Sequence, residues 1–261
     1  MKTPEVTNSP QIHMFTGFDK SELLSGLIKS GMRVTKIVVP SSKKYEVGST
    51  AIRKLASQYE IEVRTASIQQ WESLIDHSVS ESVLLSARFP LKIPRQVFGA
   101  YQFAINIHPT LLPRFRGRYL EPVLIAGESE SGVTLHLIED DYDTGPIVEQ
   151  VKYAVGRFDT VETLLRKAGE LELDLVLSAI RKLRDPNFSP MPQDPTAASE
   201  FFQPRTPSDS FIPSSTRLID ALNVVRASNS KTHPVYTVID GQKVVIAMWR
   251  PHKPASEADG I

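Results

Sequence analysis

The segment NIHPTLLPRFRG at residues 106–117, followed by DTGPI at residues 143–147, decides how the rest of this sequence is interpreted. An apolar strand, with Phe103, Ala104, Ile105 and Ile107, leads into it. Residues two apart on a strand point to the same side, so Asn106 and His108 should lie next to each other. Prolines then end the regular structure, and Asp143 follows on a glycine-containing loop. An amide donor, an imidazole and a carboxylate are the groups that stabilise a developing oxyanion and move protons near neutral pH.

Alternating strand and helix patterns surround this segment. Strands are predicted at residues 11–16, 34–39, 61–66, 83–87, 104–108 and 133–138, and helices at 21–29, 50–59 and 68–76, with a long helix from a capping box at Asp159 and Glu162 through residue 184. This alternation predicts an α/β fold, a doubly wound, mostly parallel, Rossmann-like sheet. Ligands of such sheets bind beyond the carboxyl ends of the strands. Asn106 and His108 end a strand and therefore fall at that edge.

The composition changes after the long helix. Seven prolines lie between residues 185 and 215, which predicts a linker. Beyond it, residues 216–227 have the pattern of a short helix, and residues 236–248 that of a hairpin turning at Asp240 and Gly241. We therefore predict a catalytic domain at residues 1–185, a proline-rich linker at 186–215 and a small helix-plus-β-hairpin unit at 216–261.

Composition excludes several classes of protein. The chain has 261 residues, of which 41% are hydrophobic, and no cysteine, so disulfides and thiol nucleophiles are excluded. The sequence starts with polar residues and has no long apolar run, so we expect no signal peptide and no membrane span. We therefore predict a cytoplasmic protein. The 30 basic and 30 acidic residues balance, which disfavours a nucleic-acid partner. We find no spacing typical of a metal site and no dinucleotide fingerprint.

Three segments of this chain resemble, in order and spacing, those of the folate-dependent formyltransferase family. They are NIHPTLLP at residues 106–113, GVT at 132–134 and DTGPI at 143–147. The family usually has serine where this chain has Thr110. The resemblance covers roughly residues 83–151. It implies an N-formyltransferase that takes its formyl group from N10-formyltetrahydrofolate.

The resemblance also implies roles for individual residues. Asn106 and protonated His108 would stabilise the oxyanion that forms when an amine attacks the formyl carbon, and Asp143 would orient His108 and relay protons through water. His136 is interpreted as structural, because its strand is predicted to be buried on at least one face. The resemblance further implies folate binding by Arg88, Phe89, Leu91, Ile93, Ile138 and Asp140.

The identity of the amine acceptor is less constrained. Arg114, Arg116 and Arg118 alternate after the catalytic segment and are either a solvent-facing basic edge or a site for an anionic acceptor such as a phosphate. The short, neutral chain with its small hairpin unit favours a nucleotide-linked amino sugar, an anionic small molecule. Hydroxyornithine in siderophore synthesis and methionyl-tRNA are the alternatives, with glycinamide ribonucleotide less favoured. A catalytically silent folate- or ligand-binding protein is the alternative from another class. The sequence leaves open whether the protein forms a homodimer.

Overall fold

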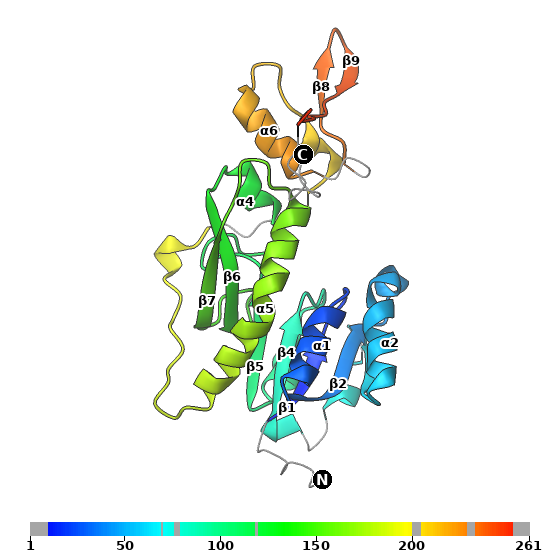
Figure 1. The fold of residues 1–261 in the computed structure, drawn as a ribbon, viewed down its shortest axis with the longest axis vertical. Coiled ribbons are helices and arrows are strands. Elements are labelled where there is room, and N and C mark those ends of the chain that lie inside the picture. Colours follow the sequence, from blue (N-terminus) through cyan, green and yellow to red (C-terminus); the bar gives the residue numbers. More distant parts are fainter. Residues whose placement is uncertain are drawn as a thin grey trace. The chain divides into compact units, whose positions relative to one another are not determined.

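A computed structural model describes residues 10–68, 70–75, 79–117, 120–199, 205–228 and 233–252 (Figure 1). Its strands are β1 (Gln11–Phe15), β2 (Arg33–Pro40), β3 (Glu62–Ala66), β4 (Ser82–Ala87), β5 (Phe103–His108), β6 (Glu130–Leu137), β7 (Ile147–Ala154), β8 (Tyr236–Ile239) and β9 (Gln242–Val245). Its α-helices are α1 (Ser21–Lys29), α2 (Thr50–Gln58), α3 (Arg95–Phe98), α4 (Glu121–Ile125), α5 (Val161–Leu183) and α6 (Leu218–Arg226).

The first seven strands form one sheet in the order β3-β2-β1-β4-β5-β6-β7. Pairing is parallel from β3 through β5, and β6 runs antiparallel to β5. The chain builds outward from β1 to β3 and then returns to the other side of β1 with β4. This confirms the predicted doubly wound, mostly parallel α/β sheet, and it places chemistry at the carboxyl ends of the central strands.

The described chain divides into two compact units, each made of three segments. The first holds residues up to 108, 134–150 and 172–193, and the second holds 109–133, 151–171 and 194 onward. These units cut across the predicted boundaries at residues 185 and 215, because β6, β7 and α5 each contribute to both. The assignment of separate catalytic, linker and C-terminal domains stays a prediction.

In the first unit, α1 packs closely against the second half of α5. A methyl group added at Gly26 would lie 2.6 Å from a Leu173 side-chain carbon, so glycine permits this approach. Beside it, the Lys20 ammonium lies 2.5 Å from the Glu172 carboxylate, and both side chains are largely buried. A buried charge is tolerated only when it is paired, which this contact provides.

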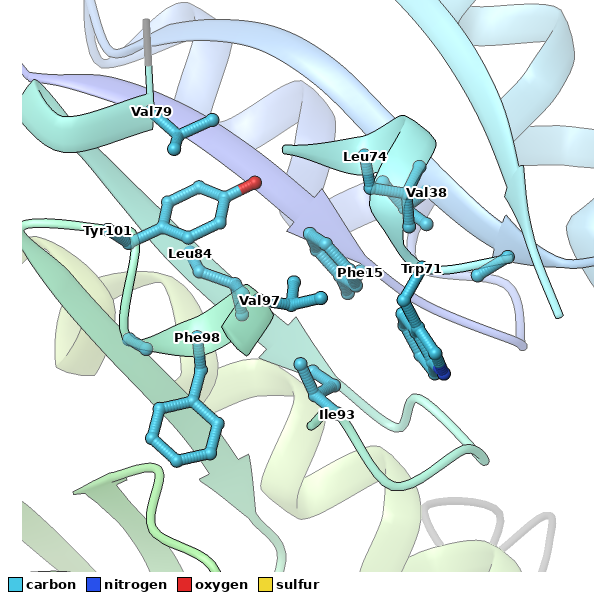
Figure 2. Close-up of a cluster of buried hydrophobic side chains, with 12 residues drawn as sticks. Phe15, Val38, Trp71, Leu74, Val79, Leu84, Ile93, Val97, Phe98 and Tyr101 are labelled. Atoms are coloured by element: carbon cyan, nitrogen blue, oxygen red, sulfur yellow. The ribbon is translucent and has the colours of Figure 1, made fainter. Parts of the chain in front are cut away.

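An aromatic and aliphatic cluster forms the core of this unit beside β1 and β4 (Figure 2). Its centre is Phe15, which is fully buried, with Leu84 and Val97 around it. Trp71 and Leu74 complete it from the segment that follows β3. Helix α3 belongs to the same cluster, so the segment that leaves β4 is tied to the core of the sheet.

The second unit has its own core, built by α4, the start of α5 and Ala227, which follows α6. Arg226 is 4% exposed and donates to the backbone carbonyls of Gly156 and Leu124, which joins α6 to α4 and to the segment between β7 and α5. Burial lowers the pKa of this guanidinium. In the same unit, the buried Thr110 hydroxyl donates to the Phe115 carbonyl at 3.2 Å, a bond that serine can also make.

Most predicted elements are found within two or three residues of their expected ends, but the helix predicted at 68–76 is wrong. The chain makes only a 3₁₀ turn at Glu72–Leu74, and residues 69 and 76–78 lie outside the described part. Trp71 and Leu74 are three residues apart, and a single turn with a period of three suffices to bury both. Ile68, which a longer helix would have used, is 75% exposed.

The capping box predicted at Asp159 and Glu162 is also wrong. The reciprocal pair is Thr160 and Thr163, whose hydroxyls each accept from the other residue's backbone N–H. The Asp159 carboxylate instead accepts from the Gly156 N–H and pairs with Lys167 at 2.5 Å. These nearby partners occupy the carboxylate in place of the cap. No helix among the described residues is long and apolar enough to cross a membrane.

Candidate active site

Strand β5 places two polar side chains at the centre of the sheet. Asn106 and His108 are its fourth and sixth residues, so both point to the same face. The neighbouring parallel strand β4 pairs Ser86 with Asn106, and the two strands end at the same edge. His108 is 3% exposed. This is the carboxyl edge at which ligands of doubly wound sheets bind.

On its other side, β5 pairs with the antiparallel strand β6, and Asn106 lies directly opposite His136. The His136 Nδ1 atom is 2.7 Å from the Leu137 carbonyl, so Nδ1 carries the proton. The unprotonated Nε2 atom then accepts from the Asn106 Nδ2 amide at 3.1 Å. This contact sets the amide's rotation, because the nitrogen end of Asn106 must face the imidazole.

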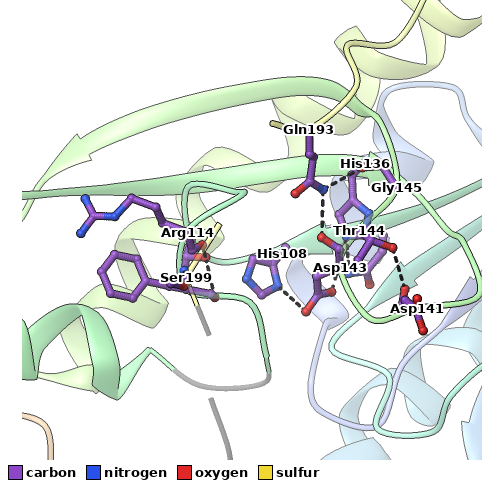
Figure 3. Close-up of polar contacts among 12 residues, drawn as sticks. His108, Arg114, His136, Asp141, Asp143, Thr144, Gly145, Gln193 and Ser199 are labelled. Carbon is purple, nitrogen blue, oxygen red and sulfur yellow. Dashed lines mark hydrogen bonds and ion pairs between the residues drawn. The ribbon is translucent and has the colours of Figure 1, made fainter. Parts of the chain in front are cut away.

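Asp143 reaches both imidazoles from the loop between β6 and β7 (Figure 3). One carboxylate oxygen is 3.6 Å from His108 Nδ1, and the other is 3.6 Å from His136 Nε2. Both separations are longer than a hydrogen bond, and only a protonated imidazole would make either contact an ion pair. The Asp143 side chain is 13% exposed and the two histidines are at most 4% exposed. Water therefore screens these contacts weakly.

The arrangement has a defined chemical capacity. A carboxylate beside His108 Nδ1 favours the protonated imidazole and leaves Nε2 to donate or accept a proton elsewhere. The amide of Asn106 is a second donor on the same face. Together these groups can stabilise negative charge on an oxygen and transfer a proton, as acyl-transfer sites require.

Comparison with known proteins identifies the family. Residues 14–180, well over half of the chain, match the family model described as formyl transferase. The chain belongs to the formyl transferase family. The match runs from the end of β1 through most of α5 and includes Asn106, His108 and Asp143.

Individual members of the formyl transferase family match this chain over different lengths. The methionyl-tRNA formyltransferase of Thermotoga maritima is 31% identical over 193 residues, which are 69% of this chain and 60% of that protein. Two solved structures have the same fold. A likely sugar N-formyltransferase from Mycobacterium tuberculosis has a TM-score of 0.68, with 21% identity over 94% of this chain and 100% of that one. WlaRD, a sugar 3N-formyl transferase, has a TM-score of 0.69, with 17% identity over 91% of this chain and 85% of that one.

Six residues of this formyl transferase family member are predicted to bind folate, and four of them are apolar. All four contact the aromatic cluster of the first unit. The Phe89 ring lies edge-on to Phe15, at 5.4 Å between centroids. Ile93 belongs to the cluster itself, while Leu91 and Ile138 pack against it and stay partly exposed. The segment that carries Phe89, Leu91 and Ile93 follows β4 at the carboxyl edge of the sheet.

The other two predicted folate-binding residues, Arg88 and Asp140, are polar. Arg88 places its guanidinium 4.3 Å from the centre of the Phe18 ring. Asp140 makes a two-pronged ion pair with Arg95. The hydrogen bond from Arg95 lowers the pKa of the Asp140 carboxyl and raises that of the guanidinium. Both side chains are mostly exposed, so the pair adds little stability. A folate-binding role for these residues stays a prediction.

The predicted arginine cluster divides between different surroundings. The Arg114 guanidinium is half exposed and lies 2.5 Å from the Glu128 carboxylate. It also stacks on the Phe115 ring at 4.7 Å. Arg116 is less exposed, with its Nε atom buried. Arg118 lies outside the described residues. Acceptor binding by these arginines stays a prediction.

Two residues of the site lacked a signal strong enough to predict them. His136 was interpreted as structural, and its position opposite Asn106 depends on strand register. The second is Gln193, in the segment predicted as a linker, whose side-chain amide donates to the backbone carbonyls of Asp143 and Gly145 at 2.8 Å each. Nothing local in a proline-rich sequence indicates such a contact.

Proposed function

We propose that this protein is an N-formyltransferase that moves a formyl group from N10-formyltetrahydrofolate to a primary amine. One observation carries the proposal, namely the convergence of Asn106, His108 and Asp143 at the carboxyl edge of the sheet, with the carboxylate 3.6 Å from the His108 ring. Membership of the formyl transferase family supports it. The chain spans 60% of the Thermotoga maritima relative, so the activity of the whole protein is part of the proposal.

Each residue has a distinct task in this reaction. Asn106 and protonated His108 donate hydrogen bonds to the formyl oxygen as it gains negative charge. Asp143 keeps the His108 ring oriented and protonated, and through water it relays the proton that the attacking amine loses to the folate nitrogen that leaves. His136 fixes the amide rotation of Asn106, so that the second amide N–H is free to point towards the reacting centre.

The residues present fit a reduced folate. A pterin is flat and largely apolar with a hydrogen-bonding edge, and such groups bind in apolar sites with a few polar atoms. Partly exposed apolar surface is offered by Phe89, Leu91 and Ile138. The segment that carries Phe89 and Leu91 also carries Arg88 and Ile93. When bound, formyltetrahydrofolate supplies the activated formyl group. Among the described residues, no three histidine, aspartate or glutamate side chains are grouped so as to hold a metal ion.

For the acceptor, we propose a nucleotide-linked amino sugar. WlaRD, whose structure was determined with dTDP and 5-N-formyl-THF, aligns with this chain over most of both lengths. The match covers 91% of this chain and 85% of that one, which supports an acceptor of the same class. Methionyl-tRNA is the second candidate, because the Thermotoga maritima relative with that activity is 31% identical.

A panel of acceptors tests this proposal. The protein, incubated with N10-formyltetrahydrofolate, should add the mass of one formyl group to a dTDP- or UDP-linked amino sugar and not to hydroxyornithine, glycinamide ribonucleotide or methionyl-tRNA. Mass spectrometry measures the product. If only methionyl-tRNA is formylated, it replaces the nucleotide sugar as the proposed acceptor. If calorimetry shows binding of reduced folate but no acceptor is formylated, the catalytically silent binding protein is favoured.

Neutralising an arginine that binds the acceptor's phosphates should raise the Michaelis constant about tenfold and change turnover little, because charge-assisted hydrogen bonds are lost equally from the ground and transition states. Arg114→Ala, Arg116→Ala and Arg118→Ala are compared by steady-state kinetics with the nucleotide sugar. Arg166→Ala, which removes an exposed arginine paired with Glu170 on α5, is the control. Unchanged kinetics in the three single variants would remove the arginine cluster from the acceptor site.

A further inference from the structure

We propose that Gln193 is a positioning residue of the active site, which holds the Asp143–Gly145 turn so that the Asp143 carboxylate faces His108 and His136. The proposal rests on the function proposed above. Gln193 lies outside the residues that the sequence resemblance implies, in the segment that follows α5.

The contact itself is specific. The Gln193 Nε2 atom lies 2.8 Å from the Asp143 carbonyl and 2.8 Å from the Gly145 carbonyl (Figure 3). A carboxamide nitrogen has two hydrogens, so one side chain can serve both acceptors. Since carbonyls only accept, the amide's orientation is determined. The two acceptors are the carbonyls of the residues on either side of Thr144.

The backbone at Asp143 has a conformation that these contacts help to hold. Its φ angle is +56°, in the left-handed region that non-glycine residues seldom adopt. A residue held there persists only when its surroundings determine the conformation. The Gln193 amide binds the carbonyl of this same residue, and the Thr144 hydroxyl adds a contact to the Asp141 carbonyl at 3.3 Å.

The strand register explains why Gln193 reaches this turn. The backbones of Met191 and Ile147 pair in both directions at 2.8 Å, in antiparallel orientation. Antiparallel register then sets residue 193 opposite residue 145. On the other side of the turn, the Leu137 N–H donates to the Pro146 carbonyl at 2.9 Å. The turn is thereby fixed between β6 and the segment that carries Gln193.

The consequence for catalysis follows from the position of the carboxylate. Asp143 contacts one imidazole with each oxygen at 3.6 Å. A rotation of the turn would withdraw it from both rings, and misplacement of a catalytic group by about 1 Å can cost a hundredfold in rate. Gln193 acts through Asp143, so turnover should change more than substrate binding.

The test compares variants that keep or remove the two donors. Gln193→Met preserves length and removes both donors, and Gln193→Lys supplies N–H donors again from a flexible chain. We expect Gln193→Met to lower kcat about tenfold, with KM for folate and acceptor within about twofold, and Gln193→Lys to recover part of the loss. The control is Asn187→Ala, an exposed amide in the same segment whose side chain bonds to Asp185.

A second readout does not depend on activity. The ring NMR signals of His108, assigned through His108→Gln, should move in Gln193→Met and stay in place in Asn187→Ala, because the carboxylate beside the ring has shifted. If wild type transfers no formyl group, the proposed function fails while these signals still decide the role of Gln193. Two outcomes overturn the proposal. One is unchanged His108 signals in Gln193→Met. The other is a fall in kcat with an equal rise in KM and a lower melting temperature in Gln193→Met, none of which Gln193→Lys recovers.

Discussion

His108→Gln and Asp143→Asn should each lower the turnover number of formyl transfer at least about a hundredfold, the lower end of what a positioned general acid or base contributes. Without the imidazole, position 108 cannot provide a charged donor to the developing oxyanion, and a neutral amide in place of the Asp143 carboxylate cannot keep the imidazole charged. Single-turnover kinetics, with folate release followed by absorbance, measures the loss. Asn106→Ala should likewise reduce turnover more than binding, since its donor is used mainly in the transition state.

The variants are chosen so that folding is preserved. Asparagine tolerates the left-handed backbone that Asp143 adopts, and glutamine fills most of the space that an alanine would leave at the buried His108. The matched control is Asp141→Asn, which removes an exposed carboxylate from the same loop and retains the carbonyl that Thr144 contacts. Near-normal turnover in His108→Gln or Asp143→Asn, with the fold intact, would contradict the assigned mechanism.

The parts of the site that could be predicted are those that local sequence determines. Asn106 and His108 share a face because they are two residues apart on one strand, and Asp143 follows on a loop whose glycine is visible in the sequence. The strands of the sheet were predictable for the same reason, since runs such as residues 34–39 (VTKIVV) are rich in β-branched and apolar residues. Strand β7 was missed, because only its first two residues are buried and the rest of the strand is partly or fully exposed.

The parts that could not be predicted depend on partners distant in sequence. His136 belongs to the site because the register of β5 and β6 places it opposite Asn106, and that register is fixed by the whole sheet. Gln193 depends on the pairing of Met191 with Ile147. Asp159 is a different case, because its carboxylate is taken by nearby partners, the Gly156 N–H and the Lys167 ammonium, rather than by the helix cap.

Gly145→Ala should both destabilise the protein and reduce turnover. The added methyl carbon would lie 1.9 Å from the Leu137 carbonyl oxygen, a backbone atom that cannot move without displacing β6. Forcing atoms into a filled site costs about 3 kcal/mol at the upper end of the usual range. At about 2–4 °C per kcal/mol for a chain of this size, calorimetry should show a melting temperature lower by roughly 6–12 °C.

The same substitution elsewhere provides the matched control. Gly169 lies on the exposed side of α5, and a methyl group there meets nothing within 4 Å. Alanine is favoured over glycine inside a helix by about 1 kcal/mol, so Gly169→Ala should raise the melting temperature by about 2–4 °C and leave turnover unchanged. Turnover should fall in Gly145→Ala because the Gly145 carbonyl accepts from Gln193 and Asp143 lies two residues before Gly145. A Gly145→Ala protein with wild-type stability and turnover would show that the close approach of this turn to β6 does not hold the carboxylate in place.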